Sequence, residues 1–400
     1  MMKNVGLAVC LGVLSLSLAA CGGTDEDLKG GGGSGGSGGS GGGGECENSM
    51  TSFKGDCLKL EKPDPKLGFQ LHFGPKSYDD AAEVAKFTLA PGEETNACLY
   101  MTTPNEEQVF FYDYDSTVRP GTHHMIIFSA KESEKPDGLF EGDCPAIPGL
   151  EWSFMVGAQN GIDPAGARIK VPEDGKPLAS ENKGMAMILP PKTRIAYTVH
   201  FVNQSRDEGI LQESWANFKY MEPAKVTQPA ATLFWIGGLN MEVPPRQRQV
   251  IEGECTNLED TPRRLVTITG HVHANTTRFT AYKIPANDPT NKQRVYEIYD
   301  WAHADLFYYD SANKNPLPNR ERGIPGASTG ELVLAKGDKL RWECDVFNRT
   351  DKVLTFGNEA YTAEMCNVFG LSAPLPENGA NTWNCYSVAK VQENPDPPMP

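Results

Sequence analysis

The sequence lacks the patterns that place a chain in several common functional classes. It has no run or stripe of Lys and Arg and a formal net charge of -15 at pH 7, so we expect no nucleic-acid partner. Outside the Gly/Ser-rich residues 30–44 there is no GxGxxG pattern, there is no phosphate-binding loop, and no organic cofactor is implied. No CxxC pair occurs, which argues against a compact zinc or iron–sulfur site. Long helical periodicity is scarce.

Short β-branched or aromatic runs fill much of the chain instead, separated by clusters of Gly, Pro, Asn and Asp. Residues 194–202, 265–272 and 353–356 are examples. Runs at this spacing predict an all-β protein built from sandwiches or barrels. The 400 residues, 39% hydrophobic and 22% charged, are enough for two domains with separate cores.

The N-terminus has the features of an export signal. Residues 1–20 join a positive start to a short apolar segment, and Leu18-Ala19-Ala20-Cys21 resembles a bacterial lipobox. We therefore expect lipidation of Cys21 and anchoring to a membrane, the outer one in a Gram-negative source; the alternative is a simple secretory signal with a chance cysteine. The linker, residues 21–44, is rich in Gly and Ser, and its 15-residue stretch 30–44 reaches roughly 20 Å. Residues 391–400 form a Pro-rich tail.

Eight cysteines remain once Cys10 and Cys21 of the signal region are set aside. An even number in an exported chain predicts four disulfides and an oxidising compartment. Spacing alone leaves the pairing open, because eight cysteines allow 105 connectivities.

Five of the seven histidines lie in short motifs, and strand alternation gives each motif a face. His271 and His273 share the more polar face of their predicted strand, opposite Val266, Ile268 and Val272. His200 lies with Thr198, opposite an apolar face formed by Ile195, Tyr197, Val199 and Phe201. We therefore expect these strands to present imidazoles on the outer surface of a hydrophobic sandwich.

His123 and His124 are adjacent, and neighbours on a regular strand point to opposite faces. They can share a metal only at a strand entrance or a β-bulge. Pro120-Gly121, just upstream, supplies a turn signal there.

Ligand chemistry indicates the metal. Three neutral imidazoles suit copper or zinc, whereas two imidazoles with the thioether of Met365 favour Cu(I). Each motif also has a simpler interpretation: an HxH motif as a surface pair, and Met365 as a core residue. The joint occurrence of the motifs favours metal binding.

These motifs together resemble those of the copper type II, ascorbate-dependent monooxygenases, the family of peptidylglycine α-hydroxylating monooxygenase and dopamine β-hydroxylase. His123-His124-Met125-Ile126-Ile127-Phe128 is similar to the family's HHMxxF signature, and Val199-His200-Phe201, His271-Val272-His273 and Glu364-Met365-Cys366-Asn367 to its later motifs. The four occur in the family's order, and the resemblance covers roughly residues 46–388.

The resemblance implies two coppers. His123, His124 and His200 would hold an electron-storing ion, and His271, His273 and Met365 a second ion where O2 reacts with the substrate. It also implies two β-sandwich domains facing each other across a solvent-filled cleft, which we place at residues 45–225 and 226–390. The implied disulfides are Cys98–Cys144, Cys255–Cys385, Cys344–Cys366 and Cys46–Cys57.

The implied activity is hydroxylation of a C–H bond of a small molecule, with O2 and two electrons from ascorbate or another donor. Peptide amidation is not expected, because Phe369 stands where the amidating members have tyrosine; Ala130 and Ala274-Asn275-Thr276 also depart from the family pattern. The alternative is a non-catalytic copper-binding or electron-transfer lipoprotein. His72 is interpreted as structural, and His303 as either a half-buried strand residue or a contact to the site. The sequence assigns no oligomeric state.

Overall fold

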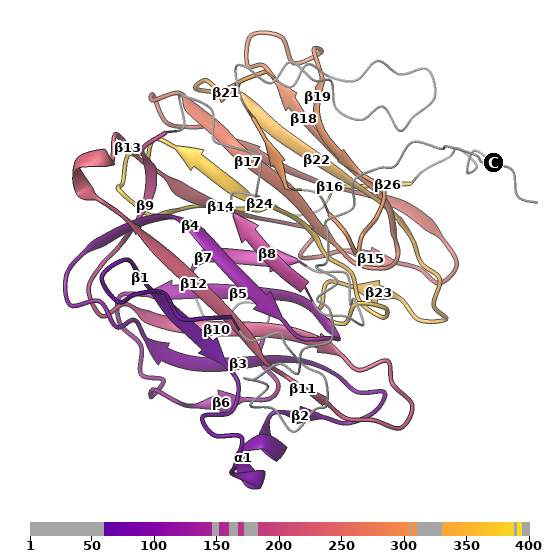
Figure 1. Cartoon of the computed structure of the whole chain (residues 1–400). Coiled ribbons are helices and arrows are strands. Elements are labelled where there is room, and N and C mark those ends of the chain that lie inside the picture. The colour runs from indigo at the N-terminus through magenta and orange to yellow at the C-terminus, as the bar shows by residue number, and fades with distance from the viewer. Residues whose placement is uncertain are drawn as a thin grey trace, which may run out of the picture. The chain divides into compact units, whose positions relative to one another are not determined.

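The computed structural model (Figure 1) describes residues 60–145, 152–159, 167–171, 183–304, 306–309, 330–387 and 390–393. These all belong to one compact unit, Cys46–Pro400. The export signal, Cys21, the Gly/Ser linker, Cys46 and Cys57 lie outside the described residues. The described chain is almost entirely strands, with one short α-helix, α1 (Ala81–Lys86), and one 3-10 turn (Pro223–Lys225). The all-β prediction is confirmed.

Strands from the earlier part of the chain build a first sandwich of two sheets. Its outer sheet has the order β1 (Gly68–Phe73), β12 (Ser214–Met221), β4 (Val109–Val118), β9 (Met185–Leu189), β13 (Gln228–Pro229), with β8 (Ala167–Val171) beside β4. Its other sheet, which we call the first inner sheet, has the order β6 (Phe140–Glu141), β3 (Glu94–Thr102), β10 (Arg194–Val202), β5 (Thr122–Ala130), β7 (Ser153–Gln159). A small ladder joins β2 (Thr88–Leu89) to β11 (Ile210–Leu211).

The later strands build a second sandwich, coloured from red-pink through orange to yellow in Figure 1. Its second inner sheet has the order β20 (Phe307–Tyr308), β17 (Arg263–Val272), β24 (Cys366–Ala373), β14 (Ala231–Gly237), β25 (Thr382–Ser387), with β21 (Leu332–Leu334) beside β17. Its outer sheet has the order β19 (Gln293–Ile298), β18 (Thr276–Ile284), β22 (Lys339–Phe347), β16 (Arg248–Thr256), β26 (Lys390–Glu393). A small ladder joins β15 (Glu242–Val243) to β23 (Leu354–Thr355).

Each sandwich has its own apolar core, and a third core joins the two inner sheets. Phe73, Phe111 and Tyr197 belong to the core of the first sandwich. Trp235 and Trp342 stack in the core of the second, with ring centroids 6.0 Å apart. The third core brings together residues of β3, β5 and β7 with Phe234 and Ile236 of β14. The inner sheets therefore cover each other's outward faces.

Three disulfides lie in the described chain: Cys98–Cys144, Cys255–Cys385 and Cys344–Cys366. They match the pairings that the family resemblance implies. Disulfides of this kind indicate that the protein folds in an oxidising compartment. None of the described helices has the length and apolar character needed to cross a membrane.

Candidate metal centre

A β-bulge brings His123 and His124 to the same side of the first inner sheet. On β5, His124 pairs with His200 of β10 and Thr122 pairs with Phe201, so His123 is the extra residue. The turn before it needs glycine: Gly121 has φ 83°, and a Cβ there would lie 2.5 Å from the Ile210 side chain. The predicted irregularity at this pair is confirmed.

His200 is held by a carboxylate from the neighbouring strand. Its Nε2 lies 2.9 Å from Oε1 of Glu94, at the start of β3. Glu94 also accepts a hydrogen bond from the backbone N–H of Ala360, in the second sandwich, at 2.7 Å. Glu94 therefore fixes the His200 ring and ties it to the loop that leads to Met365.

His271 and His273 come from the end of β17 and the turn after it. Nδ1 of His271 lies 3.0 Å from Oε1 of Gln159, at the end of β7 in the first sandwich. The Gln159 amide nitrogen donates to the Trp301 carbonyl at 2.6 Å. The backbone N–H of His273 donates to Oε1 of Glu364 at 2.5 Å. Groups of the first sandwich thus orient a histidine of the second.

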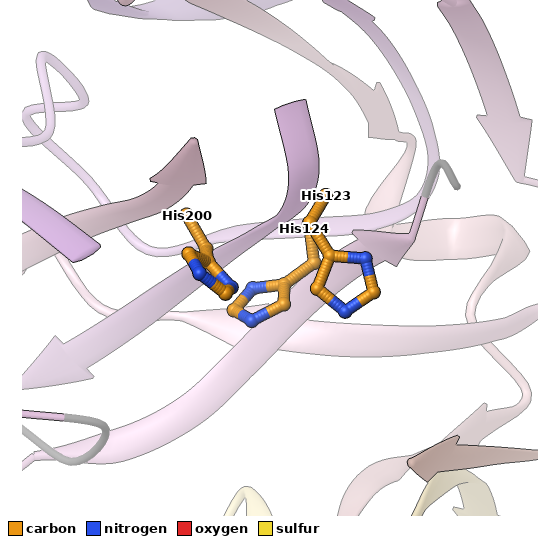
Figure 2. A group of neighbouring side chains, drawn as sticks. All are labelled: His123, His124 and His200. Atoms are coloured by element: carbon orange, nitrogen blue, oxygen red, sulfur yellow. The ribbon is translucent and has the colours of Figure 1, made fainter. Parts of the chain in front are cut away.

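The five motif histidines form one cluster. Figure 2 shows His123, His124 and His200 side by side, with ring centroids 5.1 to 5.3 Å apart. The His271 centroid lies 4.8 Å from that of His124, and the His273 centroid 5.7 Å from that of His123. Two groups have ligand nitrogens within 4.8 Å of one another, namely His123, His124, His200 and His123, His271, His273. These groups could hold a metal ion.

The cluster is buried and short of hydrogen-bond partners, as a set of metal ligands should be. No motif histidine is more than 8% exposed. Among the described residues, buried ring nitrogens without a partner include both of His123, Nδ1 of His124, Nδ1 of His200 and Nε2 of His271. Native proteins rarely leave buried polar atoms unpaired, so a bound ion is a natural partner for them.

Burial keeps four histidines of the cluster uncharged. Burial, reinforced by neighbouring imidazoles, holds the pKa of His123, His124 and His273 well below 6.5. Burial and His200 lower the pKa of His271 to about 3. Neutral imidazole is the form that binds metals, so these rings are ready to coordinate at neutral pH.

Met365 is buried beside the histidines, at the start of β24. It lines a small cavity of about 20 Å³ together with His124 and His271. Its backbone N–H donates to Glu364 Oε1 at 2.9 Å, the same oxygen that accepts the N–H of His273. Burial raises the pKa of Glu364 to about 7. The buried carboxyl group of Glu364 therefore connects the backbone of His273 to that of Met365, two members of the predicted His-His-Met set.

The surroundings of the cluster correct one expectation. The histidines occupy the outward faces of their sandwiches, as alternation predicts, yet they are buried instead of exposed. The reason is that each inner sheet covers the other, and β7 contacts β14 and β25. The two histidine sets therefore touch, whereas a solvent-filled cleft between them was expected.

His72 and His303 lie apart from the cluster. His72 stacks on Trp215 at 5.3 Å and its Nε2 lies 2.8 Å from Glu213 Oε1, which is a structural role as interpreted. His303 is in a bend and not a strand, its side chain is 62% exposed, and its Nδ1 lies 3.0 Å from Asp300 Oδ2. It lines a larger cavity next to the cluster.

Sequence reasoning assigned no role to Glu94, Gln159, Glu364 or Trp301. Trp301 lies 5.3 Å from His123, ring to ring. Strand alternation could have indicated Glu94. It lies two residues before Asn96, so the two side chains share one face of β3, and Asn96 pairs with His200. Gln159 and Trp301 had no such signal, since their contacts to the cluster depend on how the sandwiches pack.

Comparisons with known proteins leave the family open. No family model matches the chain, and no curated protein matches it. Among solved structures, one titled "Crystal Structure of the STIV MCP" is 9% identical, with a TM-score of 0.25, covering 78% of this chain and 98% of that chain. A similarity of this size carries no functional inference.

Proposed function

We propose that the chain is a copper-dependent monooxygenase that hydroxylates a C–H bond of a small molecule. One observation carries the proposal: a buried cluster of five histidines, contributed by both sandwiches, has ring nitrogens without partners and a methionine beside it. Neutral imidazoles suit copper or zinc, and a thioether ligand favours Cu(I) over zinc. We therefore assign His123, His124 and His200 to one copper and His271, His273 and Met365 to the other.

The reaction explains the need for two redox ions. One C–H bond, O2, two electrons and two protons give one C–OH group and one water. Ascorbate, or another reductant of similar potential, supplies the electrons, and each bound copper can hold one of them. The motif order resembles that of the ascorbate-dependent family, which is a second support for the proposal.

The chain's own residues orient the ligands. The contacts of Glu94 and Gln159 leave Nδ1 of His200 and Nε2 of His271 free to coordinate. Glu364 fixes the backbone of His273 relative to Met365. The 20 Å³ cavity beside Met365 exceeds the roughly 10–15 Å³ that one water-sized molecule requires. One molecule of about the size of water therefore has a place next to the assigned ligands.

The deciding experiment measures copper content and O2 uptake of the purified protein together. We expect two coppers per chain and O2 uptake under ascorbate that depends on a C–H substrate. Met365→Ile should abolish turnover and leave copper bound at the three-histidine site. Met241→Ile, a buried methionine of the second core, is the matched control and should keep turnover. Two coppers without coupled uptake would instead support the non-catalytic copper-binding lipoprotein.

We also propose that the protein acts at a membrane surface, held by a lipid on Cys21 and the Gly/Ser linker. The lipobox-like sequence supports this placement. Intact-mass analysis of the membrane fraction should show the acyl chains, and Cys21→Ser should release the protein in unlipidated form.

A further inference from the structure

On the basis of the proposed function, we infer that the substrate is an uncharged, largely apolar molecule bound in the larger cavity between the sandwiches. This cavity has a volume of about 280 Å³. Small-molecule sites range from roughly 300 to 1,000 Å³, so a compact molecule such as a phenylethyl compound is of suitable size. Its walls come from β4, β7 and β9 of the first sandwich and from β14, β17 and β24 of the second.

The cavity reaches the metal cluster through two shared side chains. Gln159 lines it and contacts Nδ1 of His271 at 3.0 Å. Phe369 lines both this cavity and the small one beside Met365, and its ring centroid lies 5.6 Å from that of His271. A molecule in the cavity is therefore one side chain away from an assigned copper ligand.

Apolar and polarisable groups dominate the lining. Phe154 and Phe369 stack with centroids 5.1 Å apart and an interplanar angle of 10°. Met155 and Met187 add flexible thioethers, which adapt to irregular ligand shapes. These walls offer dispersion contacts and aromatic stacking to a hydrocarbon skeleton.

The described lining contains no Asp, Glu, Lys or Arg. Several of its polar groups already have partners inside the protein. The Tyr114 hydroxyl donates to the Gly157 carbonyl at 2.6 Å, and the Thr232 hydroxyl donates to the Phe154 carbonyl at 2.8 Å. Gln159 uses both ends of its amide. His303 lies at the exposed edge beside Asp300.

Against the described lining, an ionic substrate would therefore lose its hydration without gaining a counter-charge. Such a transfer is far more unfavourable than that of a neutral group. The described part of the lining thus selects against both a carboxylate and an ammonium on the substrate.

Three probes of one skeleton test this: 2-phenylethanol, phenethylamine and 3-phenylpropanoate. Their affinities for the full chain, with and without copper, are measured by calorimetry. We expect the neutral probe to bind at least about tenfold more tightly than either ion, a difference of about 1.4 kcal/mol. Equal or tighter binding of an ion would overturn the inference.

A charge introduced into the lining locates the site. Leu306 is half-buried in the wall, and Leu306→Arg should tighten 3-phenylpropanoate binding and weaken that of phenethylamine. Leu258→Arg is the matched control, because Leu258 is 78% exposed and lies outside the lining. The same change in both variants would place the binding elsewhere and overturn the inference.

The failures of the two proposals are distinguishable. If neutral probes bind but no O2 uptake follows, the monooxygenase assignment fails while the ligand class of the cavity stands. If uptake is coupled only to charged substrates, the monooxygenase stands and the inference is overturned.

Discussion

Acidification should destabilise the metal-free protein through its buried histidines. His123, His124, His271 and His273 have pKa values below the ordinary 6.5 in the folded chain, because burial and neighbouring imidazoles disfavour their charged forms. Below pH 6.5 the unfolded chain binds protons that the folded chain does not. The free energy of unfolding therefore falls as the pH falls.

The magnitude follows from the ordinary pKa of 6.5 in the unfolded chain, for histidines that stay neutral in the folded chain. At pH 5.5 each of the four histidines lowers the free energy of unfolding by ~1.4 kcal/mol relative to pH 7.5. Glu364 acts in the opposite direction, because its raised pKa of about 7 makes the folded chain the one that gains a proton. Between pH 7.5 and pH 5.5, protonation of Glu364 in the folded chain raises the free energy of unfolding by about 2 kcal/mol. The net fall is about 3–4 kcal/mol, a large part of the typical 5–15 kcal/mol of a native protein.

Urea unfolding of the metal-free protein at several pH values between 5.5 and 7.5 measures this fall. His123→Ala should reduce it by ~1.4 kcal/mol, since one proton fewer is taken up. Val346→Ala, a buried change in the second core, should lower stability at every pH and leave the fall unchanged. If His123→Ala shows the same fall as the unchanged protein, the ring is not buried and neutral in solution, and the closed cluster is refuted.

Two further predictions concern the supports of the cluster, and a third concerns packing in the second sandwich. Gln159→Leu should weaken copper binding at the His271 site by roughly 10–100-fold in a Cu(I) competition assay, whereas Gln159→Glu keeps the acceptor and should bind normally. Glu364→Leu leaves two buried N–H groups without an acceptor and should lower the free energy of unfolding by about 2–6 kcal/mol. Glu364→Gln keeps one carbonyl oxygen as an acceptor and should lower the free energy of unfolding much less. Equal losses of stability in the two variants would show that the acceptor is unimportant. Gly253→Ala places a Cβ 2.2 Å from the Trp342 ring and should cost about 1–3 kcal/mol in the same assay, in contrast to Gly142→Ala, whose Cβ is 3.6 Å from Phe140.

Local pattern predicted much of this structure. Alternation placed His200 opposite the apolar face of β10, and that strand spans the predicted residues 194–202. The adjacent histidines required a break in a regular strand, and the bulge at His123 supplies it. Both features depend on residues within a few positions of each other, which is why the sequence alone could indicate them.

The closed cluster could not be predicted in the same way. A polar face on a strand is compatible with solvent or with a partner sheet, and alternation does not separate the two. Whether the polar face meets solvent or a partner sheet depends on residues such as Ile126 and Phe234. These residues are far apart in sequence and lie in one core only when the inner sheets pack. The contacts of Gln159 to His271 and of Glu94 to Ala360 depend on the same packing.

The packing of the sandwiches and metal binding should therefore be coupled. Packing of the two inner sheets against each other buries the apolar third core, which stabilises the contact. The same packing buries ring nitrogens without partners, and each of these costs roughly 1–3 kcal/mol. Bound ions remove that penalty on both sides of the contact, because each sandwich supplies one of the two assigned ligand sets. Metal binding then stabilises the same contact between sheets that forms the substrate cavity. Loss of metal should accordingly loosen this contact before it unfolds either sandwich, because each sandwich keeps its own core and at least one disulfide.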